Sequence, residues 1–269
     1  MKLTDATPGT SPAIGADAVP ALRFSGVSKA FGQVPALADF SLDIAPGELF
    51  GLVGVNGAGK TTLIKCLLDF CAADAGTIEI FGTPHSRTRA RAPLVFLPER
   101  FNPPHFLTGR DFMRYMLTLH GRSLDPGQAE RMLGALDLDL AALKRPVRAY
   151  SKGMTQKLGL AACLLCDKAL YVLDEPTSGL DPKARALLKA QFRALKARGA
   201  TLFFTSHALA DVNEICDRMA VLHDGRVRFA GTPDELCRQF EVPDLEQAFL
   251  HCIDDRPGQT VNNPPLLAK

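Results

Sequence analysis

Short apolar runs alternate with segments of helical periodicity along most of this chain. Apolar runs bounded by turn residues indicate strands, and apolar positions that recur every three or four residues indicate helices. We expect strands near residues 22–26, 38–44, 49–54, 77–81, 93–97, 169–173, 201–205 and 218–223. Because strands and helices alternate, the pattern predicts an α/β fold built on a mostly parallel sheet.

Two local patterns add detail to this prediction. The pair Asp224-Gly225 lies between two apolar strand-like runs, which is a strong signal for a β-hairpin. Between about 101 and 165 the strand pattern stops and helical periodicity replaces it. There Thr108 and Asp111 resemble a helix N-cap and its partner, and the next apolar positions share one face: Phe112, Tyr115, Met116 and Leu119. The sequence therefore predicts a helical insert at about 101–165.

The two ends of the chain differ from its middle. Residues 1–20 are rich in Ala, Pro, Gly and Thr and lack the apolar core of a signal peptide, so we expect a flexible leader. Residues 236–269 are expected to form a short C-terminal extension whose polar end, beyond Asp254, is disordered. The main domain is then 21–235. No internal repeat is visible, and no apolar run approaches the roughly 18 residues of a membrane span.

Composition and charge narrow the choice of partners and compartment. Hydrophobic residues make up 46% of the 269 residues and charged residues 22%, with a net charge of +2 and no block of like charge, so composition gives no case for nucleic acid. The seven cysteines show no metal-binding rhythm. Cys163 and Cys166 form a lone C-x-x-C inside the apolar stretch 158–166, which we interpret as a buried helix. Buried thiols in odd number fit a reducing cytoplasm.

The most specific chemical signal is the segment Gly54-Val55-Asn56-Gly57-Ala58-Gly59-Lys60-Thr61. It matches the phosphate loop G-x-x-x-x-G-K-[ST] and lies between a predicted strand and a predicted helix. In such a loop the backbone N–H groups and the helix N-terminus hold an anion, the lysine reaches the β- and γ-phosphates, and the hydroxyl binds Mg²⁺. The alternative is a glycine-rich turn between core elements. The pair Lys60-Thr61 directly follows the last glycine, as the phosphate-loop pattern requires, and this favours phosphate binding. We predict binding of a nucleoside triphosphate by Gly54, Asn56, Gly57, Ala58, Gly59, Lys60, Thr61 and Thr62.

Acidic residues and a histidine at strand ends supply a second half of this site. The predicted strand 169–173 ends in Asp174 and Glu175, of which the first is suited to hold Mg²⁺ and the second to polarise an attacking water. Two acidic residues at a strand end are often only solvent-exposed turn residues. The phosphate loop earlier in the chain favours the functional interpretation instead. His207 follows the strand 201–205, where an imidazole could contact the γ-phosphate.

The order of these motifs resembles that of the ATP-binding subunits of ABC transporters, over about residues 22–231. The segment Tyr150-Ser151-Lys152-Gly153-Met154 stands where that family has its signature, usually Leu-Ser-Gly-Gly-Gln. Ser178-Gly179-Leu180-Asp181 matches the D-loop, His207 the switch histidine, and Phe31 the aromatic residue that stacks on adenine. The resemblance implies a P-loop NTPase core with a mixed β-sheet, an antiparallel β subdomain and an inserted α-helical subdomain.

The resemblance also implies a mechanism. Two such domains, identical or different, pack head to tail and hold ATP and Mg²⁺ between one phosphate loop and the partner's signature. Ser151, Gly153 and Asp181 would then act on the partner's nucleotide, with Glu175 as general base and His207 as its helper in this chain's own site. ATP-driven closure would power a separate integral membrane permease docked on the helical insert, so the chain would lie in the cytoplasm on the inner face of the cell membrane.

Two positions depart from the family pattern. Where most members carry a glutamine, this chain has Glu99, which could still bind Mg²⁺ or its waters; the alternative is that it is simply exposed. In the signature, Lys152 replaces a glycine and Met154 replaces glutamine. These departures, and a motif-like segment at 244–250 that could equally be an ordinary amphipathic helix end, resemble the branch whose ATPase pairs with a separate permease for export.

Two other functions stay open from the sequence. One is an ABC ATPase of a non-transport machine, such as cofactor assembly, since such a protein also has a single ATPase domain. The other is a regulatory module that binds ATP without hydrolysing it. The presence of Lys60, Asp174, Glu175 and His207 together argues against the second alternative.

Overall fold

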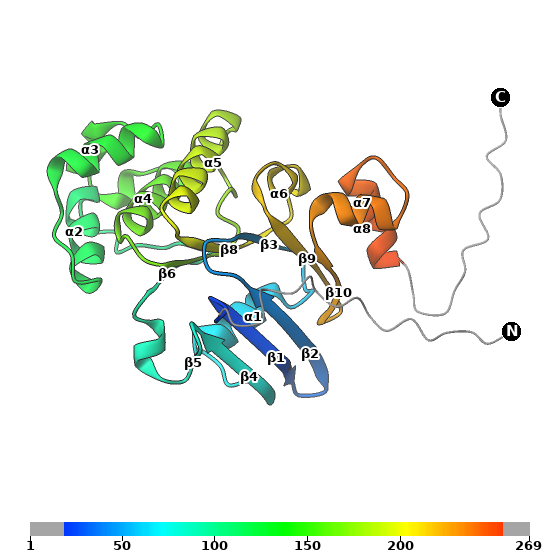
Figure 1. Cartoon of the computed structure of the whole chain (residues 1–269). Coiled ribbons are helices and arrows are strands. Elements are labelled where there is room, and N and C mark those ends of the chain that lie inside the picture. Colours follow the sequence, from blue (N-terminus) through cyan, green and yellow to red (C-terminus); the bar gives the residue numbers. More distant parts are fainter. Residues whose placement is uncertain (1–18, 255–269) are drawn as a thin grey trace, which may run out of the picture.

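The computed structural model describes residues 19–254, which fold around two β-sheets (Figure 1). The predicted leader, apart from its last two residues, and the predicted disordered end beyond Asp254 lie outside the described residues. The α/β fold is confirmed: a mixed sheet carries helices on one side and faces an antiparallel sheet on the other.

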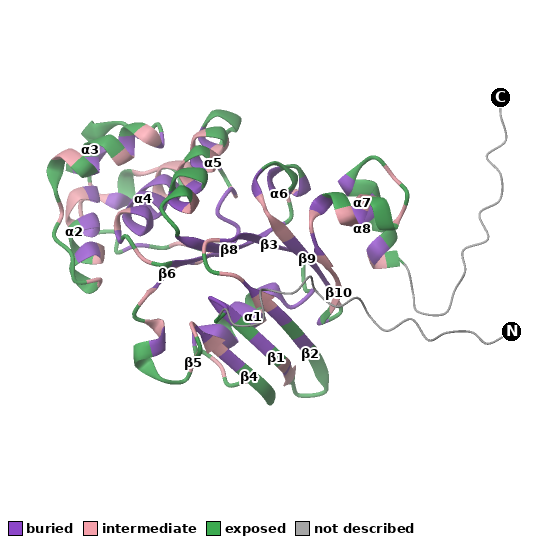
Figure 2. Ribbon diagram, viewed as in Figure 1, coloured by how far each residue is buried: buried purple, intermediate pink, exposed green. Residues whose placement is uncertain are grey.

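The mixed sheet has six strands in the order β10-β9-β3-β8-β7-β6. They span Leu49–Val53 (β3), Leu94–Leu97 (β6), Leu170–Leu173 (β7), Thr201–Ser206 (β8), Arg218–His223 (β9) and Arg226–Gly231 (β10). All neighbours pair in parallel except β10 with β9. Because both faces of the sheet are covered, its central strands are apolar throughout, and every residue of β3 and β7 is buried (Figure 2).

The second sheet is antiparallel, in the order β2-β1-β4-β5. Its strands are Leu22–Phe31 (β1), Val34–Ile44 (β2), Ala75–Ile80 (β4) and Thr83–Pro84 (β5). The sequence predicted only 22–26 and 38–44 of the first two strands. The remaining parts of both strands, near the turn that joins them, are mostly half-buried or exposed, although Val27 and Leu37 are buried. Register shifts in the pairing of β1 with β2 interrupt the alternation of apolar and polar positions there.

The predicted hairpin at Asp224-Gly225 is confirmed. Both residues have positive φ, 48° and 71°, and Arg226 pairs with His223 across the turn. A two-residue turn with positive φ at both positions matches the right-handed twist of its strands, and Asp-Gly is well suited to it.

Two hydrophobic cores lie on opposite faces of the mixed sheet. One core fills the space between the two sheets around helix α1, Lys60–Leu67, and contains the aromatic contact between Phe24 and Phe40, whose ring centroids are 5.4 Å apart. The other core joins the opposite face to the remaining helices. The phosphate-loop helix α1 is therefore held from both sides by packed sheets, which makes its N-terminus a rigid platform.

The region 101–165 is helical, with short turns between its helices. It contains α2 (Gly109–Leu119), α3 (Pro126–Ala135) and α4 (Lys152–Leu165), together with the 3₁₀ segments Leu140–Lys144 and Val147–Ala149. Thr108 caps α2 as predicted, accepting a hydrogen bond from the Asp111 N–H at 3.2 Å. The predicted apolar face of α2 was partly wrong. Phe112, Met113 and Leu117 are buried, whereas Tyr115 and Leu119 are exposed, because the helix is turned toward the 3₁₀ segment and α4.

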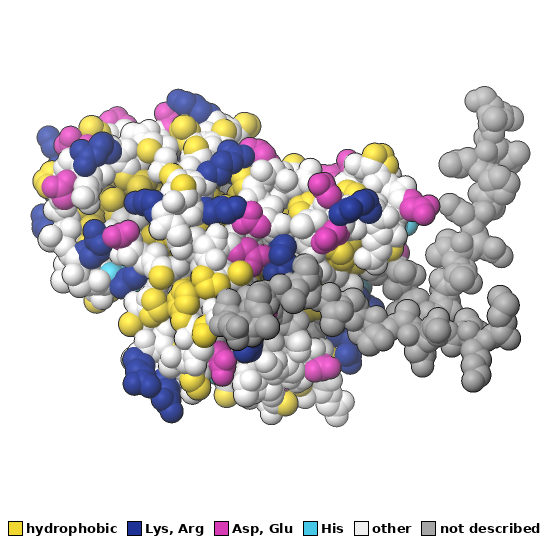
Figure 3. Space-filling model, viewed as in Figure 1, with side chains coloured by type: hydrophobic (Ala, Val, Ile, Leu, Met, Phe, Trp, Pro, Cys, Tyr) yellow, Lys and Arg dark blue, Asp and Glu magenta, His cyan; other side chains and the backbone are white. Residues whose placement is uncertain are grey.

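The remaining helices follow β7. They are α5 (Pro182–Ala197), α6 (Leu209–Ile215), α7 (Pro233–Gln239) and α8 (Leu245–Asp254), and a short 3₁₀ turn at Thr88–Arg91 precedes β6. Helix α8 includes the motif-like segment near 244–250 and packs on α6, α7 and the β9–β10 hairpin. Within residues 19–254, no helix is both long enough and apolar enough to cross a membrane. Acidic and basic side chains are interspersed on the face shown in Figure 3.

Candidate functional site

The phosphate loop connects β3 to α1 and depends on glycine at several positions. Gly57 and Gly59 have φ of 84° and 112°, in the left-handed region that glycine adopts without strain. A side chain at Gly54 would collide with the Leu222 backbone, and one at Gly59 with the Ala36 carbonyl group. The loop is thus pressed against two neighbouring strands and leaves its N–H groups at the N-terminus of α1 for an anion.

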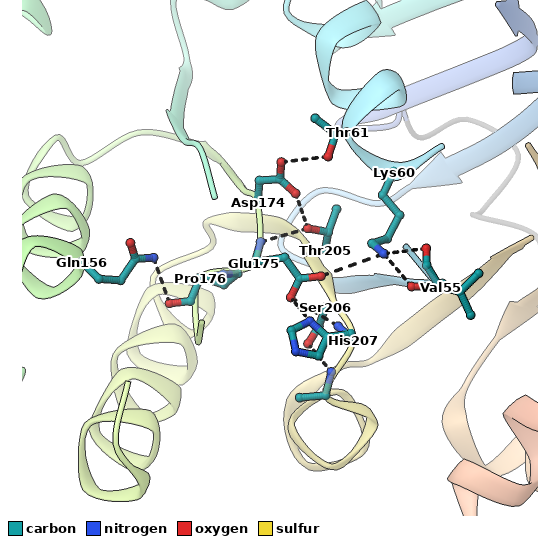
Figure 4. Close-up of polar contacts among 12 residues, drawn as sticks. Val55, Lys60, Thr61, Gln156, Asp174, Glu175, Pro176, Thr205, Ser206 and His207 are labelled. Carbon is teal, nitrogen blue, oxygen red and sulfur yellow. Dashed lines mark hydrogen bonds and ion pairs between the residues drawn. The ribbon is translucent and has the colours of Figure 1, made fainter. Parts of the chain in front are cut away.

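Lys60 is the first residue of α1 and its side chain bends back over the loop (Figure 4). Its Nζ donates to the Gly54 carbonyl oxygen at 2.5 Å and to the Val55 carbonyl oxygen at 3.2 Å, and lies 4.0 Å from Glu175 Oε1. Burial lowers the pKa of the Lys60 ammonium, and the carboxylates of Glu175, Asp174 and Glu99 act in the opposite direction. A buried cation with such weak ionic contacts is suited to receive phosphate oxygens.

Asp174 lies at the end of β7 and is contacted by two hydroxyl groups. Thr205 Oγ1 donates to its Oδ1 at 2.6 Å, and Thr61 Oγ1 donates to its Oδ2 at 3.3 Å. Burial raises the pKa of the Asp174 carboxyl, while these two hydrogen bonds oppose the shift. The sequence assigned Asp174 and Thr61 to one metal ion, and the fold brings their oxygens together.

The oxygen donors at this place fit Mg²⁺. Thr61, Asp174 and Glu99 line one cavity and offer a hydroxyl and two carboxylates, which are hard ligands of the kind Mg²⁺ takes together with substrate phosphates and water. Over residues 19–254, no cluster of three or more His, Cys, Asp or Glu side chains forms a metal cage by itself. A cation here would therefore need the phosphates of a nucleotide to complete its coordination. Bound there, Mg²⁺ would neutralise charge on the β- and γ-phosphate oxygens.

Glu175 is held in an unusual backbone conformation beside His207. Its φ is 49°, in the left-handed region, and its N–H donates to Thr205 Oγ1 at 2.9 Å. Its Oε2 lies 2.8 Å from His207 Nδ1 and accepts from the His207 N–H at 3.3 Å. Glu175 is buried, whereas the His207 ring is 67% exposed, so the histidine covers the carboxylate from the solvent side. Strain of this kind at a carboxylate is typical of functional sites.

These groups share one cavity of about 460 Å³, a volume suited to a nucleotide. It is lined by Ala36, Val55, Asn56, Gly57, Ala58, Gly59, Lys60, Thr61, Thr62, Glu99, Asp174, Glu175 and His207. Gly54 does not line the cavity, but its carbonyl group binds Lys60. Figure 4 shows the Glu175 carboxylate between Lys60 and His207, and Thr205 between Asp174 and Glu175.

Besides Gly54, four residues predicted for the site lie outside this cavity. Phe31 ends β1 with 55% of its surface exposed, and Lys29 Nζ lies 5.6 Å from its ring centroid. Ser151 caps α4 by accepting from the Met154 N–H at 3.2 Å, and Asp181 caps α5 by accepting from the Ala184 N–H at 2.9 Å. Gly153 is in the first turn of α4, where a Cβ would lie 3.3 Å from the Gly179 carbonyl oxygen.

Residues 37–178 match the family model described as ABC transporter. The chain belongs to the ABC transporter ATP-binding family. This cassette is 39% identical over 208 residues to an uncharacterized ABC transporter ATP-binding protein of Synechocystis. The aligned residues cover 76% of this chain and 58% of the relative. It is 38% identical to the Nod factor export ATP-binding protein I of Paraburkholderia xenovorans, over 80% of this chain and 72% of that protein. The chain spans 58% and 62% of the first two relatives that it matches.

Solved structures agree with this assignment. An ATP-binding subunit of an ABC transporter superposes with a TM-score of 0.76 at 30% identity, covering 86% of this cassette and 99% of that chain. A dimeric ATP-binding cassette in a post-hydrolysis state, bound to ADP and phosphate, has a TM-score of 0.71 at 21% identity, over 78% of this cassette. The second similarity shows a shared fold.

The sequence interpretation missed two contributors to the site of this cassette. Thr205 is fully buried, and its single hydroxyl joins the backbone of Glu175 to the carboxylate of Asp174. Its position directly before Ser206-His207, at the end of an apolar strand, was the only signal that could have found it. Ala36 lines the cavity from β2, a contact that no local motif announces.

The lone C-x-x-C lies at the C-terminal end of α4. Cys163 is buried in the last turn of α4 and Cys166 is buried directly after it, and burial raises the pKa of the two thiols, to about 11 for Cys166. Protonated thiols packed in a core are inert, in agreement with the predicted buried helix.

Proposed function

We propose that this cassette binds Mg²⁺-ATP in the 460 Å³ cavity and hydrolyses it. The phosphate-loop N–H groups and Lys60 hold the β- and γ-phosphates, and Thr61, Asp174 and Glu99 hold the metal ion. Glu175 takes a proton from the attacking water, whose oxygen bonds to the γ-phosphorus while the bond to the ADP oxygen breaks. His207 holds the Glu175 carboxylate in place and contacts the transferred phosphate. The family is one of ATPases, which supports this assignment.

The cassette acts, in this proposal, as one half of a dimer. The observation that carries this step is the position of Ser151 and Gly153, which belong to the family signature yet do not line their own cavity. The dipole of α4 favours an anion at its N-terminus, where Ser151 and Lys152 are exposed. A second cassette, identical or different, would bring its ATP to this turn, and Asp181 and its loop would lie beside it.

Dimer closure on ATP would drive a separate integral membrane permease. ATP favours the closed state because it contacts both subunits there and one subunit otherwise. The cassette would be peripheral on the inner face of the cell membrane, with the region 101–165 as the docking part. Export is supported by relatives named as Nod factor export ATP-binding proteins. The substrate of such a transporter is selected by its permease, and nothing on this cassette needs to touch it.

The test is affinity capture with Glu175→Gln cassette in ATP, from membrane and non-membrane fractions. Glutamine keeps the side-chain shape but cannot take the proton, so ATP binding and closure persist while hydrolysis stops. Recovery of a multi-span membrane protein in ATP and not in ADP is expected, with Glu246→Gln on the exposed face of α8 as the matched control. Recovery of water-soluble partners alone would overturn the transport role and favour an assembly-type ATPase.

A further inference from the structure

Lys157 is a buried lysine in α4 that the site described above does not use. The residue is 8% exposed, although lysine is rarely buried without partners. Its Nζ donates to the Asp137 carbonyl oxygen at 2.9 Å and lies 3.7 Å from Asp137 Oδ2 and 3.9 Å from Asp181 Oδ2. A buried ammonium needs such partners, because an unpaired charge in the interior is costly.

The partners of Lys157 come from two different parts of the fold. Asp137 follows α3 in the helical region, where its φ is 56°. Asp181 ends the segment 175–181, which begins at Glu175 and connects β7 to α5. Lys157 therefore links the helical region to the far end of the segment that carries the proposed catalytic base.

The neighbouring residue makes a link at the near end of the same segment. Gln156 is buried, and its Nε2 donates to the Pro176 carbonyl oxygen at 3.3 Å (Figure 4). Pro176 directly follows Glu175. Gln156 and Lys157 thus hold the segment 175–181 at both of its ends, one residue past Glu175 and at Asp181.

The middle of the segment packs against the first turn of α4. A side chain at Gly153 would lie 3.3 Å from the Gly179 carbonyl oxygen, and one at Gly179 would lie 3.3 Å from the Lys152 stem. Gly179 also has a φ of 74°, so a side chain there would be strained, and a side chain at Gly153 would fit only tightly. The signature turn and the segment 175–181 consequently form one continuous surface.

We propose that Gln156 and Lys157 are positioning residues that hold the first turn of α4 and the segment 175–181 as one rigid unit. Contact of a second cassette's ATP with Ser151 then sets the position of this chain's own Glu175. The inference rests on the proposed function for its effect on hydrolysis, but the link itself exists in a single chain.

Two measurements test the link, both with Lys157→Met and Lys157→Arg. The first is amide hydrogen exchange in the nucleotide-free chain, where Lys157→Met should raise exchange at residues 177–181 about tenfold, and Lys157→Arg should not. The second is ATP hydrolysis, where Lys157→Met should lower kcat about tenfold and leave the KM for ATP within twofold, because the phosphate loop is untouched. Lys157→Arg should recover at least half of kcat.

Lys183→Met is the matched control. It removes the same charge from a lysine that pairs with the same Asp137, at 2.7 Å, but Lys183 is 70% exposed and holds no part of the segment 175–181. It should leave exchange and kcat within twofold of the wild type. If Lys157→Met does not fold, Asp181→Asn removes the second carboxylate while keeping the helix cap, and should show the same changes in smaller degree.

The outcomes separate the link from the proposed function. Unchanged exchange at 177–181 in both Lys157→Met and Asp181→Asn would overturn the link, whatever the wild type does with ATP. A loss of kcat that Lys157→Arg fails to restore would also overturn it. If exchange responds as expected but the wild type does not dimerise in ATP, the link stands and the proposed dimer fails.

Discussion

The Thr205 hydroxyl group donates a hydrogen bond to Asp174 Oδ1 at 2.6 Å, and its oxygen, Thr205 Oγ1, accepts one from the Glu175 N–H. One buried hydroxyl on β8 thus fixes the two carboxylates that end β7. It orients the metal-binding carboxylate and supports the left-handed backbone of the proposed base. Misplacement of a reacting group by about 1 Å can cost on the order of 100-fold in rate.

We therefore predict that Thr205→Val lowers kcat roughly 10- to 100-fold. The change keeps the shape of the side chain and leaves Asp174 Oδ1 and the Glu175 N–H without their partner. The matched control is Thr201→Val in the same strand, where the hydroxyl accepts from the Gly47 N–H at 2.9 Å, away from the site. Each variant should lose about 1 kcal/mol of unfolding free energy, measured with urea. Equal kcat in the two variants would contradict this role for Thr205.

Asp174→Asn should stabilise the nucleotide-free cassette. Burial raises the pKa of Asp174, so its ionised form is disfavoured in the folded state, and the stability linked to this group is lost as pH rises through the folded pKa. Near pH 7 a neutral amide of the same shape removes that cost. We expect the melting temperature to rise by about 2–4 °C per kcal/mol gained, as seen by calorimetry. Mg²⁺ and ATP together should raise the melting temperature of the wild type more than that of the variant.

The affinity for Mg²⁺-ATP should depend on pH at both ends of the range. On the acid side, binding weakens as Asp174 is protonated, at a pH above the ordinary aspartate value of about 3.9. On the alkaline side, binding weakens as Lys60 loses its proton, at a pH below the ordinary lysine value of about 10.4. Calorimetric titration from pH 5 to 10 measures both limbs. Lys60→Arg should abolish the alkaline limb, since arginine stays charged, and its persistence would show that another group causes it.

Phe31→Ala should weaken ATP binding roughly 5- to 100-fold if the ring stacks on adenine. Phe31 is 55% exposed, so a base has room to approach its ring. Phe31→Tyr should bind ATP normally. Inorganic tripolyphosphate, which has no base, should bind all three proteins equally. Val34→Ala, at the exposed position paired with Phe31 across the β1–β2 hairpin, serves as the control.

Glu99→Gln tests the carboxylate that departs from the family pattern. Glu99 lines the cavity with Asp174 and Glu175, so three carboxylates surround one lysine. Removing one negative charge should raise the affinity for ATP without Mg²⁺ several-fold and lower the apparent affinity for Mg²⁺ in the presence of ATP. Isothermal titration measures both quantities, with Glu79→Gln on β4 as the control. An unchanged Mg²⁺ dependence would place Glu99 outside the metal site.

Much of the fold was predictable because its signals are local. The buried strands β3, β6, β7 and β8 read as apolar runs, and the Asp224-Gly225 turn depends only on two residues that tolerate positive φ. The phosphate loop was predictable for the same reason, since its chemistry is contained in eight consecutive residues. The ends of β1 and β2 near their shared turn were not, because register shifts in their pairing interrupt the two-residue alternation that marks a strand.

The sequence by itself determined which chemical groups are present and their order: a phosphate loop, a signature turn, an acid pair and a histidine. Only the tertiary structure decided their grouping. It brought Asp174, Glu175, Thr205 and His207 together from two adjacent parallel strands, and it left Ser151 and Gly153 on a separate surface. It also tied Lys157 to Asp181 and Gln156 to Pro176. The physical reason is that strand pairing and helix packing join residues far apart in the chain, and no local periodicity records which residues will meet.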